Sequence, residues 1–388
     1  MKRHFYLFLI LLLLASASCG AKKTPVPGAG RPDLYMPLIS GKAVAVVANQ
    51  TSMTGNVNLV DFLVSQGISV KRIFSPEHGF RGVADAGEPI PDDKDAVTGI
   101  PVISLYGSHH KPLPEDMKGL EVVIFDIQDV GVRFYTYIST LNYIMEACAE
   151  NKVKCIVLDR PDPNGFYFDG NIPDTAFRSF VCMHSVPVVY GMTIGEYAMM
   201  INGEKWLKGG VKCDLEVIKC KYYTHSTYYE LPVRPSPNLP NQTSVYLYPS
   251  ICFFEGTNIS LGRGTPFPFQ VFGSPLLPDK GFSFIPESVP GAKNPPLEGL
   301  KCYGKDLHNA LNEKLVPTGK IYLEWLIEAW HDYPQKDKFF TAYFDVLAGG
   351  PVLREQIIKG MTADQIRESW KEGLDKFSTI RAKYLLYK

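Results

Sequence analysis

The chain has 388 residues, which favours two domains, because one domain usually takes about 100 to 200 residues. Its 40 basic residues balance its 40 acidic ones. Proteins that bind nucleic acid or an anionic membrane surface usually have an excess of basic residues, and this chain has none, so we expect no nucleic-acid partner.

The start of the chain predicts export. Basic residues precede an apolar stretch, residues 5–14, that is too short to cross a bilayer. The following Ala-Ser-Ala-Ser-Cys-Gly resembles the cleavage box of bacterial lipoproteins, in which Cys19 becomes the lipidated first residue. Ser16 stands where such boxes usually carry Leu, so cleavage one residue earlier, without lipidation, stays open. We expect a signal peptide at 1–18, a Lys-, Pro- and Gly-rich tether at 19–35, and a periplasmic lipoprotein of the bacterial envelope that meets the membrane only through its lipid.

Five apolar runs predict the first domain, residues 36–235. Near-continuous apolar runs are typical of parallel strands buried on both faces, and helical patterns at 59–66, 140–150 and 193–202 lie between them. This alternation predicts a doubly wound α/β domain with a mostly parallel sheet. The expected strands are residues 43–48, 70–74, 102–104, 122–125 and 155–158.

A proline-rich segment, residues 234–240, separates this domain from a second one at 241–388. Three Pro remove donors and fix φ, so the segment is neither helix nor central strand. The second domain is smaller and reads as α+β, with a strand around 251–254 and a Gly-rich loop after it. Its expected helices lie near 307–314, 323–330, 362–373 and 378–384.

The eight cysteines do not form a disulfide framework. A lipidated Cys19 would leave seven, an odd number. Cys148, Cys155 and Cys252 lie in apolar contexts typical of a core, whereas Cys213 and Cys220 flank a predicted strand and could pair. There is no C-x-x-C pair and no close His spacing, so we expect no metal.

The predicted strands end in polar residues, and this row is the candidate active site, because ligands of such sheets bind beyond the carboxyl ends of the strands. The sharpest cluster is Ser75-Pro76-Glu77-His78-Gly79-Phe80-Arg81, where a carboxyl in a partly apolar cleft can serve as a general acid. A Glu77–Arg81 salt bridge is the alternative. The cluster opens a 27-residue segment before residue 102 that is long enough for a functional loop and contains Glu88.

Two further strand ends carry dense polar groups that suit a polyhydroxylated ligand. After residue 125 come Asp126, Gln128, Asp129, Arg133, Tyr135 and Tyr137. Too few ligands lie nearby for a divalent metal, and Asp126 as a helix N-cap paired with Arg133 stays open. After residue 158 come Asp159 and Arg160, which could equally form a structural ion pair.

The second domain offers Glu255 at the end of an apolar run, followed by a loop with Asn258 and Arg263. This loop lacks both Gly-Lys-Ser/Thr and G-x-G-x-x-G, so nucleotide binding is disfavoured and no cofactor is expected. We expect Glu255 to face the first domain.

Together with Val47-Ala48-Asn49-Gln50-Thr51-Ser52 and Pro235-Ser236-Pro237-Asn238-Leu239-Pro240, these segments closely resemble the NamZ-type exo-β-N-acetylmuramidases over residues 36–388. The resemblance implies a Rossmann-like domain and a smaller domain that enclose a cleft. It also implies release of N-acetylmuramic acid (MurNAc) from the non-reducing end of peptidoglycan fragments. A non-catalytic envelope lipoprotein that binds muropeptides is the alternative. An amidase or esterase is disfavoured, since neither a G-x-S-x-G elbow nor a convincing Cys-His pairing occurs.

Glycoside hydrolysis usually needs two carboxyls across the scissile bond. Under this resemblance Glu77 is the expected acid, and Glu255, Asp126 and Asp129 stay open as its partner, with Glu88 weaker. Arg offers a bidentate fork for the lactyl carboxylate of muramic acid, and amides suit its hydroxyl and acetamido groups. The remaining expected substrate contacts are Asn49, His78, Arg81, Glu88, Gln128, Arg133, Tyr135, Tyr137, Asp159, Arg160, Asn238, Asn258 and Arg263.

Overall fold

The computed structural model describes residues 23–77, 79–81, 92–107, 109–310 and 319–387. The predicted signal peptide, Cys19, His78 and Glu88 lie outside these ranges, as does the second half of the helix expected near 307–314. Within the described part of the chain, no helix is both long and apolar enough to span a membrane.

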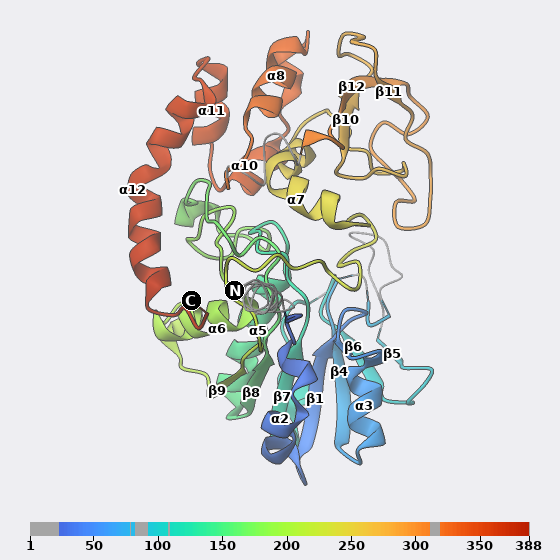
Figure 1. Cartoon of the computed structure of the whole chain (residues 1–388), viewed down its shortest axis with the longest axis vertical. Helices are drawn as coiled ribbons and strands as arrows, with labels where there is room; N and C mark the ends of the chain where they lie inside the picture. Colours follow the sequence, from blue (N-terminus) through green and yellow to red (C-terminus); the bar gives the residue numbers. More distant parts are fainter. Residues whose placement is uncertain (1–22, 78, 82–91, 108, 311–318, 388) are drawn as a thin grey trace, which may run out of the picture.

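The first domain is built on a seven-stranded sheet in the order β5-β6-β4-β1-β7-β8-β9, parallel except at β5 (Figure 1). The strands are β1 Ala43–Ala48, β4 Ser69–Ser75, β5 Asp93–Lys94, β6 Pro101–Ser104, β7 Val122–Asp126, β8 Lys154–Leu158 and β9 Leu215–Ile218. This confirms the five predicted strands. From β1 the chain first builds β4 and β6 on one side and then β7, β8 and β9 on the other. The switch point therefore lies between β1 and β7, where such sheets bind ligands.

Helices cover both faces of this sheet, because alternate strand residues point to opposite sides. Val44 and Val46 pack with α2 Pro32–Ile39 and α3 Leu59–Ser65 on one face. On the other face, Ala45 and Val47 belong to the core that includes α5 Tyr137–Asn151 and α6 Ile194–Gly203. α6 begins with a capping box of Thr193 and Glu196. The shorter elements are η1 Gly28–Gly30, the hairpin β2 Met53–Thr54 and β3 Val57–Asn58, α4 Pro114–Met117, η2 Thr175–Phe177 and η3 Lys208–Gly210.

The later part of the predicted tether is folded onto the sheet. Val26 pairs with Lys221, and the Gly28 N–H donates to the Asp159 carbonyl at 2.7 Å. A Cβ on Gly28 would lie 2.4 Å from the Ile218 carbonyl oxygen, so this close backbone approach requires glycine.

The second domain combines helices with a small antiparallel sheet, β10-β12-β11. The strand predicted around 251–254 is wrong, because this segment closes α7 Gln242–Ile251 and forms the 3-10 turn η4 Cys252–Gly256. A short apolar run cannot distinguish a strand from a buried helix, and here the Asn241 side chain caps a helix by accepting from Ser244 N–H. The other elements are β10 Val271–Ser274, β11 Ser283–Phe284, β12 Cys302–Asp306, α8 Glu324–Asp332, α9 Lys336–Phe339, α10 Ala342–Ala348, α11 Val352–Ile358 and α12 Ala363–Ala382. The helices predicted at 362–373 and 378–384 are both part of α12.

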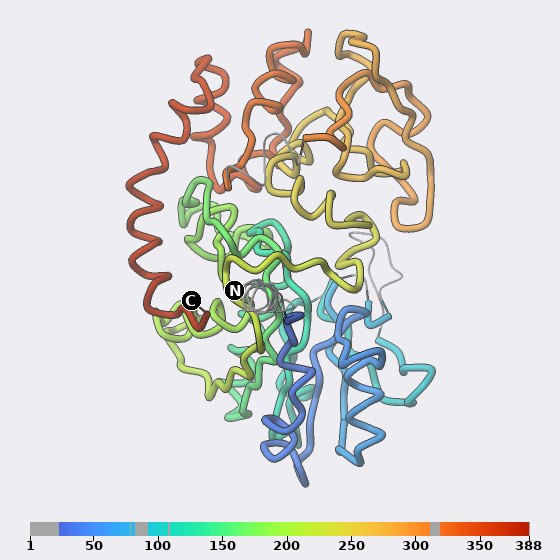
Figure 2. The backbone as a smooth tube through the Cα atoms, in the orientation of Figure 1, coloured from blue at the N-terminus to red at the C-terminus, as the bar shows by residue number. Residues whose placement is uncertain are grey.

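The two domains share one hydrophobic core. The cluster that contains Phe125 and Val157 of the first sheet also contains Phe254 and Phe344 of the second domain. α12 then runs along one side of the molecule back to α6, as Figures 1 and 2 show. A large apolar interface of this kind holds domains in a fixed arrangement.

All seven described cysteines are free and buried, so the predicted pairing of Cys213 with Cys220 is wrong. The two residues lie at opposite ends of β9, as predicted. An extended chain rises about 3.3 Å per residue, which separates such ends by roughly 20 Å. A disulfide needs Cα atoms within about 7 Å.

Candidate active site between the domains

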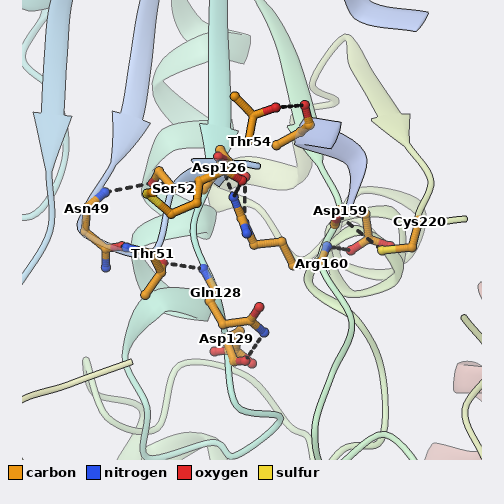
Figure 3. Close-up of polar contacts among 12 residues, drawn as sticks. Asn49, Thr51, Ser52, Thr54, Asp126, Gln128, Asp129, Asp159, Arg160 and Cys220 are labelled. Carbon is orange, nitrogen blue, oxygen red and sulfur yellow. Dashed lines mark hydrogen bonds and ion pairs between the residues drawn. The ribbon is translucent and has the colours of Figure 1, made fainter. Parts of the chain in front are cut away.

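Asn49, directly after β1, organises the switch point rather than pointing into open space (Figure 3). Its Oδ1 accepts from the Thr51 N–H at 2.8 Å and the Thr51 hydroxyl at 2.6 Å, while its Nδ2 donates to the Tyr137 hydroxyl at 2.9 Å. The Thr51 hydroxyl in turn accepts from Gln128 N–H at 3.0 Å. Asn49 is fully buried, so it positions Tyr137.

Asp126, at the end of β7, pairs with Arg160, which follows β8. Arg160 donates from Nε to Oδ1 at 2.7 Å and from Nη2 to Oδ2 at 2.8 Å, as Figure 3 shows. The side chains are 0% and 3% exposed. Arg160 also donates to the Met53 carbonyl at 3.0 Å, which fixes the β2–β3 hairpin. This geometry is that of a structural ion pair and occupies both carboxylate oxygens.

Asp159, beside Arg160 in the chain, holds the start of α6. Its carboxylate accepts from the Thr193 hydroxyl and Gly195 N–H, each at 2.8 Å, and from the Tyr387 hydroxyl at 2.5 Å. Burial raises the pKa of Asp159 to about 7, against the effect of the Tyr387 hydrogen bond. Asp159 thus ties the C-terminal segment to the first domain.

Asp129 lies deeper, in a group of buried tyrosines. It accepts from the Tyr190 hydroxyl and from Gly131 N–H. Burial raises its pKa to about 6, although these hydrogen bonds oppose the shift. Its neighbour Gln128 is also buried, and its Nε2 donates to the Pro161 carbonyl at 2.8 Å.

Arg133 is fully buried and bridges the domains. It donates to the Asn171 carbonyl at 2.8 Å, the Val186 carbonyl at 2.9 Å and the Leu347 carbonyl at 3.2 Å. Leu347 lies in the last turn of α10, where a cation is favourable. Burial lowers the pKa of Arg133. The alternative in which Arg133 partners an Asp126 helix cap is wrong, because Asp126 pairs with Arg160 and the N-cap of α5 is Thr136.

Glu77, just beyond β4, is half-buried, and we call the region between it and Glu255 and Tyr343 of the second domain the cleft. Its Oε2 accepts from the Thr136 hydroxyl at 3.3 Å, and its carboxylate is hydrogen-bonded to Tyr106. Across the cleft, Glu255 and Arg263 pair at 2.5 Å and are a quarter or less exposed. Tyr343, on α10, lies near both carboxylates: burial raises its pKa, and the charges of Glu255 and Glu77 add to the shift. Two carboxylates from different domains thus act electrostatically on one tyrosine.

A cavity of about 240 Å³ opens beside Glu255. Arg263 and Tyr343 line it, together with the apolar side chains of Ile259 and Leu261. Arg263 also stacks on Phe269, with 5.0 Å between the guanidinium carbon and the ring centroid. The cavity therefore offers one cation, one carboxylate and one phenol against an apolar wall.

Three other predicted substrate contacts, Arg81, Asn258 and Asn238, form hydrogen bonds or ion pairs within the protein. Arg81 pairs with Asp95 at 2.9 Å and with Asp61 at 3.3 Å, so the predicted Glu77–Arg81 alternative is replaced by these pairs. The exposed Asn258 donates to the Lys338 carbonyl. The buried Asn238 donates to the Gly291 carbonyl at 2.8 Å.

Tyr135 is also buried, and its hydroxyl donates to the Pro235 carbonyl at 2.6 Å. This contact holds the proline-rich crossover over Tyr137, whose ring meets that of Tyr135 edge to face at 4.7 Å.

Sequence reasoning missed Tyr106, Thr136 and Tyr343. Tyr106 follows the short strand β6, so the strand-end argument that singled out Glu77 applies to it equally. Thr136 lies inside the polar segment at 126–137, where its charged neighbours give a stronger signal. No local signal marks Tyr343, because only the docking of α10 on η4 brings it to the cleft.

The comparisons with known proteins agree with this architecture. The N-terminal and C-terminal models of the exo-β-N-acetylmuramidase NamZ match residues 44–243 and 246–387. This chain belongs to the NamZ family. The peptidoglycan β-N-acetylmuramidase NamZ of Bacillus subtilis is 38% identical over an alignment of 375 positions that covers 91% of this chain and 89% of that protein.

Two crystal structures of DUF1343 family proteins from Bacteroides fragilis share the fold of this NamZ family member. One is 45% identical with a TM-score of 0.88, and the other is 28% identical with a TM-score of 0.79. Each similarity covers 94% of this chain and 99% of the solved chain.

Proposed function

We propose that the protein is an exo-acting glycoside hydrolase that releases MurNAc from the non-reducing end of peptidoglycan fragments. The observation that carries the proposal is that Glu77 and Glu255, one carboxylate from each domain, both act electrostatically on Tyr343, which lines a cavity of about 240 Å³ together with Glu255 and Arg263. Two carboxyls on opposite sides of a cleft are what glycosidic hydrolysis requires. The Bacillus subtilis relative, a peptidoglycan β-N-acetylmuramidase, supports the same reaction.

In this proposal Glu77 donates its proton to the glycosidic oxygen, and the bond between that oxygen and the anomeric carbon breaks. The carboxylate of Glu255 acts on the anomeric carbon as base or nucleophile. The hydroxyl of a water is added to that carbon, and the remaining proton of the water restores the carboxylic acid of Glu77. Tyr106 and Thr136 hold the Glu77 carboxyl, and Arg263 holds Glu255. Asp126 and Arg160 support the cleft from below, since each is committed to the other.

Arg263 is also the proposed ligand for the lactyl carboxylate that distinguishes MurNAc from other amino sugars. One of its nitrogens contacts Glu255, and its guanidinium lines the 240 Å³ cavity. A planar guanidinium can bind a carboxylate through two parallel hydrogen bonds. The apolar residues of the same cavity suit the methyl group of a lactyl ether.

Replacement of the proposed acid tests the reaction. Glu77→Gln and Glu255→Gln are expected to lower kcat on MurNAc–GlcNAc by about 10² to 10⁴, the usual contribution of a positioned acid or base. The exposed Glu368, which pairs loosely with Lys371 on α12, supplies the control Glu368→Gln. A Glu77→Gln enzyme that folds and turns over at the wild-type rate would end the assignment.

A non-catalytic muropeptide receptor with the same cleft is the second candidate. Such a protein would be stabilised against heat by MurNAc–GlcNAc without releasing MurNAc. Detection of free MurNAc by mass spectrometry separates the two functions.

We further propose that the protein is exported and anchored as a lipoprotein, on the basis of the basic and apolar start of the chain and Cys19. Cys19→Ala is expected to move the protein from the membrane fraction to the soluble periplasmic fraction. An unchanged distribution between fractions would contradict lipidation.

A further inference from the structure

A second hollow lies outside the Glu77 cleft. It has a volume of about 850 Å³ and is bounded by α5, by the segment at 173–185 and by the segment at 205–210. Its lining includes Tyr143 and Trp206, two half-buried aromatic residues. Pockets of this size hold small organic ligands.

The floor of the hollow is rigid and neutral. His184 receives or donates hydrogen bonds at both ring nitrogens, to Tyr197 at 2.9 Å and to Asn142 at 3.1 Å. Its ring stacks on Trp206 with centroids 5.6 Å apart. Burial lowers the pKa of His184 to about 3, so the imidazole is uncharged at neutral pH. The floor carboxylate, Glu146, is neutralised by Lys111 at 3.3 Å.

The rim, in contrast, is positively charged. Arg178, Lys205 and Lys208 all line the hollow and are exposed, and none of the three forms an ion pair with another described residue. The one exposed acid in the lining is Asp174. This excess of cations around an aromatic wall is complementary to an anionic ligand with an apolar or sugar body.

Aromatic rings connect the hollow to the Glu77 cleft. Tyr106, which is hydrogen-bonded to Glu77, lies 5.9 Å from the ring of His110. His110 stacks on Phe180 at 4.1 Å and is parallel to Tyr143, 6.4 Å away. All four rings are half-buried, and Tyr143 also lines the hollow. Two ring contacts, of 5.9 and 6.4 Å between centroids, therefore lead from Tyr106 beside the proposed acid to Tyr143 in the hollow.

We propose that this hollow binds the leaving part of the substrate through a carboxylate that the saccharide carries beyond the cleaved bond. The inference rests on the proposed function, because it makes the hollow the reducing-side extension of that site. The carboxylate has two possible sources in a peptidoglycan fragment, the lactyl group of the next muramic acid or the peptide attached to it. Arg178 and Lys208 are the residues expected to contact it, and Tyr143 and Trp206 the rings expected to pack on the sugar.

Charge reversal at the rim tests the inference. The variant Arg178→Glu/Lys208→Glu changes two exposed side chains, and Lys71→Glu, at the exposed start of β4, is the matched control. Three substrates are compared: MurNAc–GlcNAc, the tetrasaccharide (MurNAc–GlcNAc)₂, and the same tetrasaccharide with a peptide on its second muramic acid. We expect kcat/KM of the double variant to match wild type on the disaccharide and to fall about tenfold on a carboxylate-bearing leaving group.

The substrates also identify the source of the carboxylate. A loss on both tetrasaccharides assigns the contact to the lactyl group, and a loss on the peptide-bearing form alone assigns it to the peptide. Equal kcat/KM ratios of variant to wild type on all three substrates would overturn the inference.

A binding measurement separates this inference from the proposed hydrolysis. Calorimetric titration of the peptide-bearing tetrasaccharide into Glu77→Gln, with and without the rim changes, needs no turnover. A roughly tenfold weaker Kd after charge reversal supports the hollow even if the wild-type protein hydrolyses nothing, and an unchanged Kd refutes it.

Discussion

Removal of Arg160 is expected to destabilise the protein without touching its chemistry. Arg160 and Asp126 are almost fully buried and joined by two hydrogen bonds of 2.7 and 2.8 Å. Breaking a buried pair by deleting one partner leaves an uncompensated charge, which costs about 3 to 5 kcal/mol. We expect Arg160→Met and Asp126→Asn each to lower the free energy of unfolding by that amount.

The double variant separates pairing from other effects. With both charges removed, Asp126→Asn/Arg160→Met should lose less than the sum of the single losses, with a coupling energy of about 1 to 3 kcal/mol. Residual loss is expected because Arg160 also donates to the Met53 carbonyl at 3.0 Å. Urea unfolding followed by tryptophan fluorescence measures these free energies.

Turnover gives the decisive comparison, because Asp126 also stood among the candidate catalytic carboxyls. Release of MurNAc per folded molecule should stay within about threefold of wild type in Asp126→Asn, measured at a temperature where the variant is folded. A variant that keeps its full unfolding free energy and loses its turnover would refute this reasoning and return Asp126 to the reaction.

Three further predictions follow from buried or shared groups. Arg133→Met should lower the unfolding free energy by at least about 3 kcal/mol, since it removes several hydrogen bonds from a charged donor and each contributes about 1.5–3 kcal/mol. Arg133→Lys should restore little, and a denaturation midpoint like that of wild type would contradict the bridging role. Asp129 binds its proton more tightly in the folded state, where its pKa is about 6 against about 3.9 in an unfolded chain. Its protonated form therefore contributes up to about 3 kcal/mol to stability. This contribution is present below pH 4 and is lost as pH rises through 6. Asp129→Asn should flatten the unfolding free energy between pH 4 and 6, and an equally steep profile would show that Asp129 is not its source. Tyr343→Phe should reduce kcat about tenfold with no change in melting temperature, and unchanged kcat would remove the hydroxyl from the site.

The local sequence pattern predicted the sheet edge at which the polar residues lie, but not the residues that their side chains contact. Apolar runs such as residues 43–48 and 122–125 predict strands that are buried on both faces. Because these strands are parallel, their carboxyl ends lie at the same edge of the sheet. Partners depend on strand order. Asp159 and Arg160 are neighbours in the chain, yet successive residues of extended chain point to opposite sides, and the pairing of β7 with β8 puts Arg160 against Asp126 instead.

Contacts between the domains were the least predictable part of the site. Glu255 was expected to face the first domain, since it follows an apolar run before a Gly-rich loop, but the element that carries it is a 3-10 turn rather than a strand end. Its neighbour Tyr343 comes from α10, almost ninety residues further along the chain. Only tertiary packing, with Phe344 against Gly256, brings the two together.

Because the two domains share one core, the conformational entropy of the site is lost when the chain folds and not when a ligand binds. The walls that carry Glu77 and Glu255 are joined through Phe125, Phe254 and Phe344, so they are placed when the chain folds and not when a sugar arrives. Ordering that is completed during folding does not subtract from binding affinity. The heat-capacity change on ligand binding should therefore be little more than the burial of sugar surface accounts for. Substitutions in the core, far from the cleft, should weaken sugar binding before they unfold the protein.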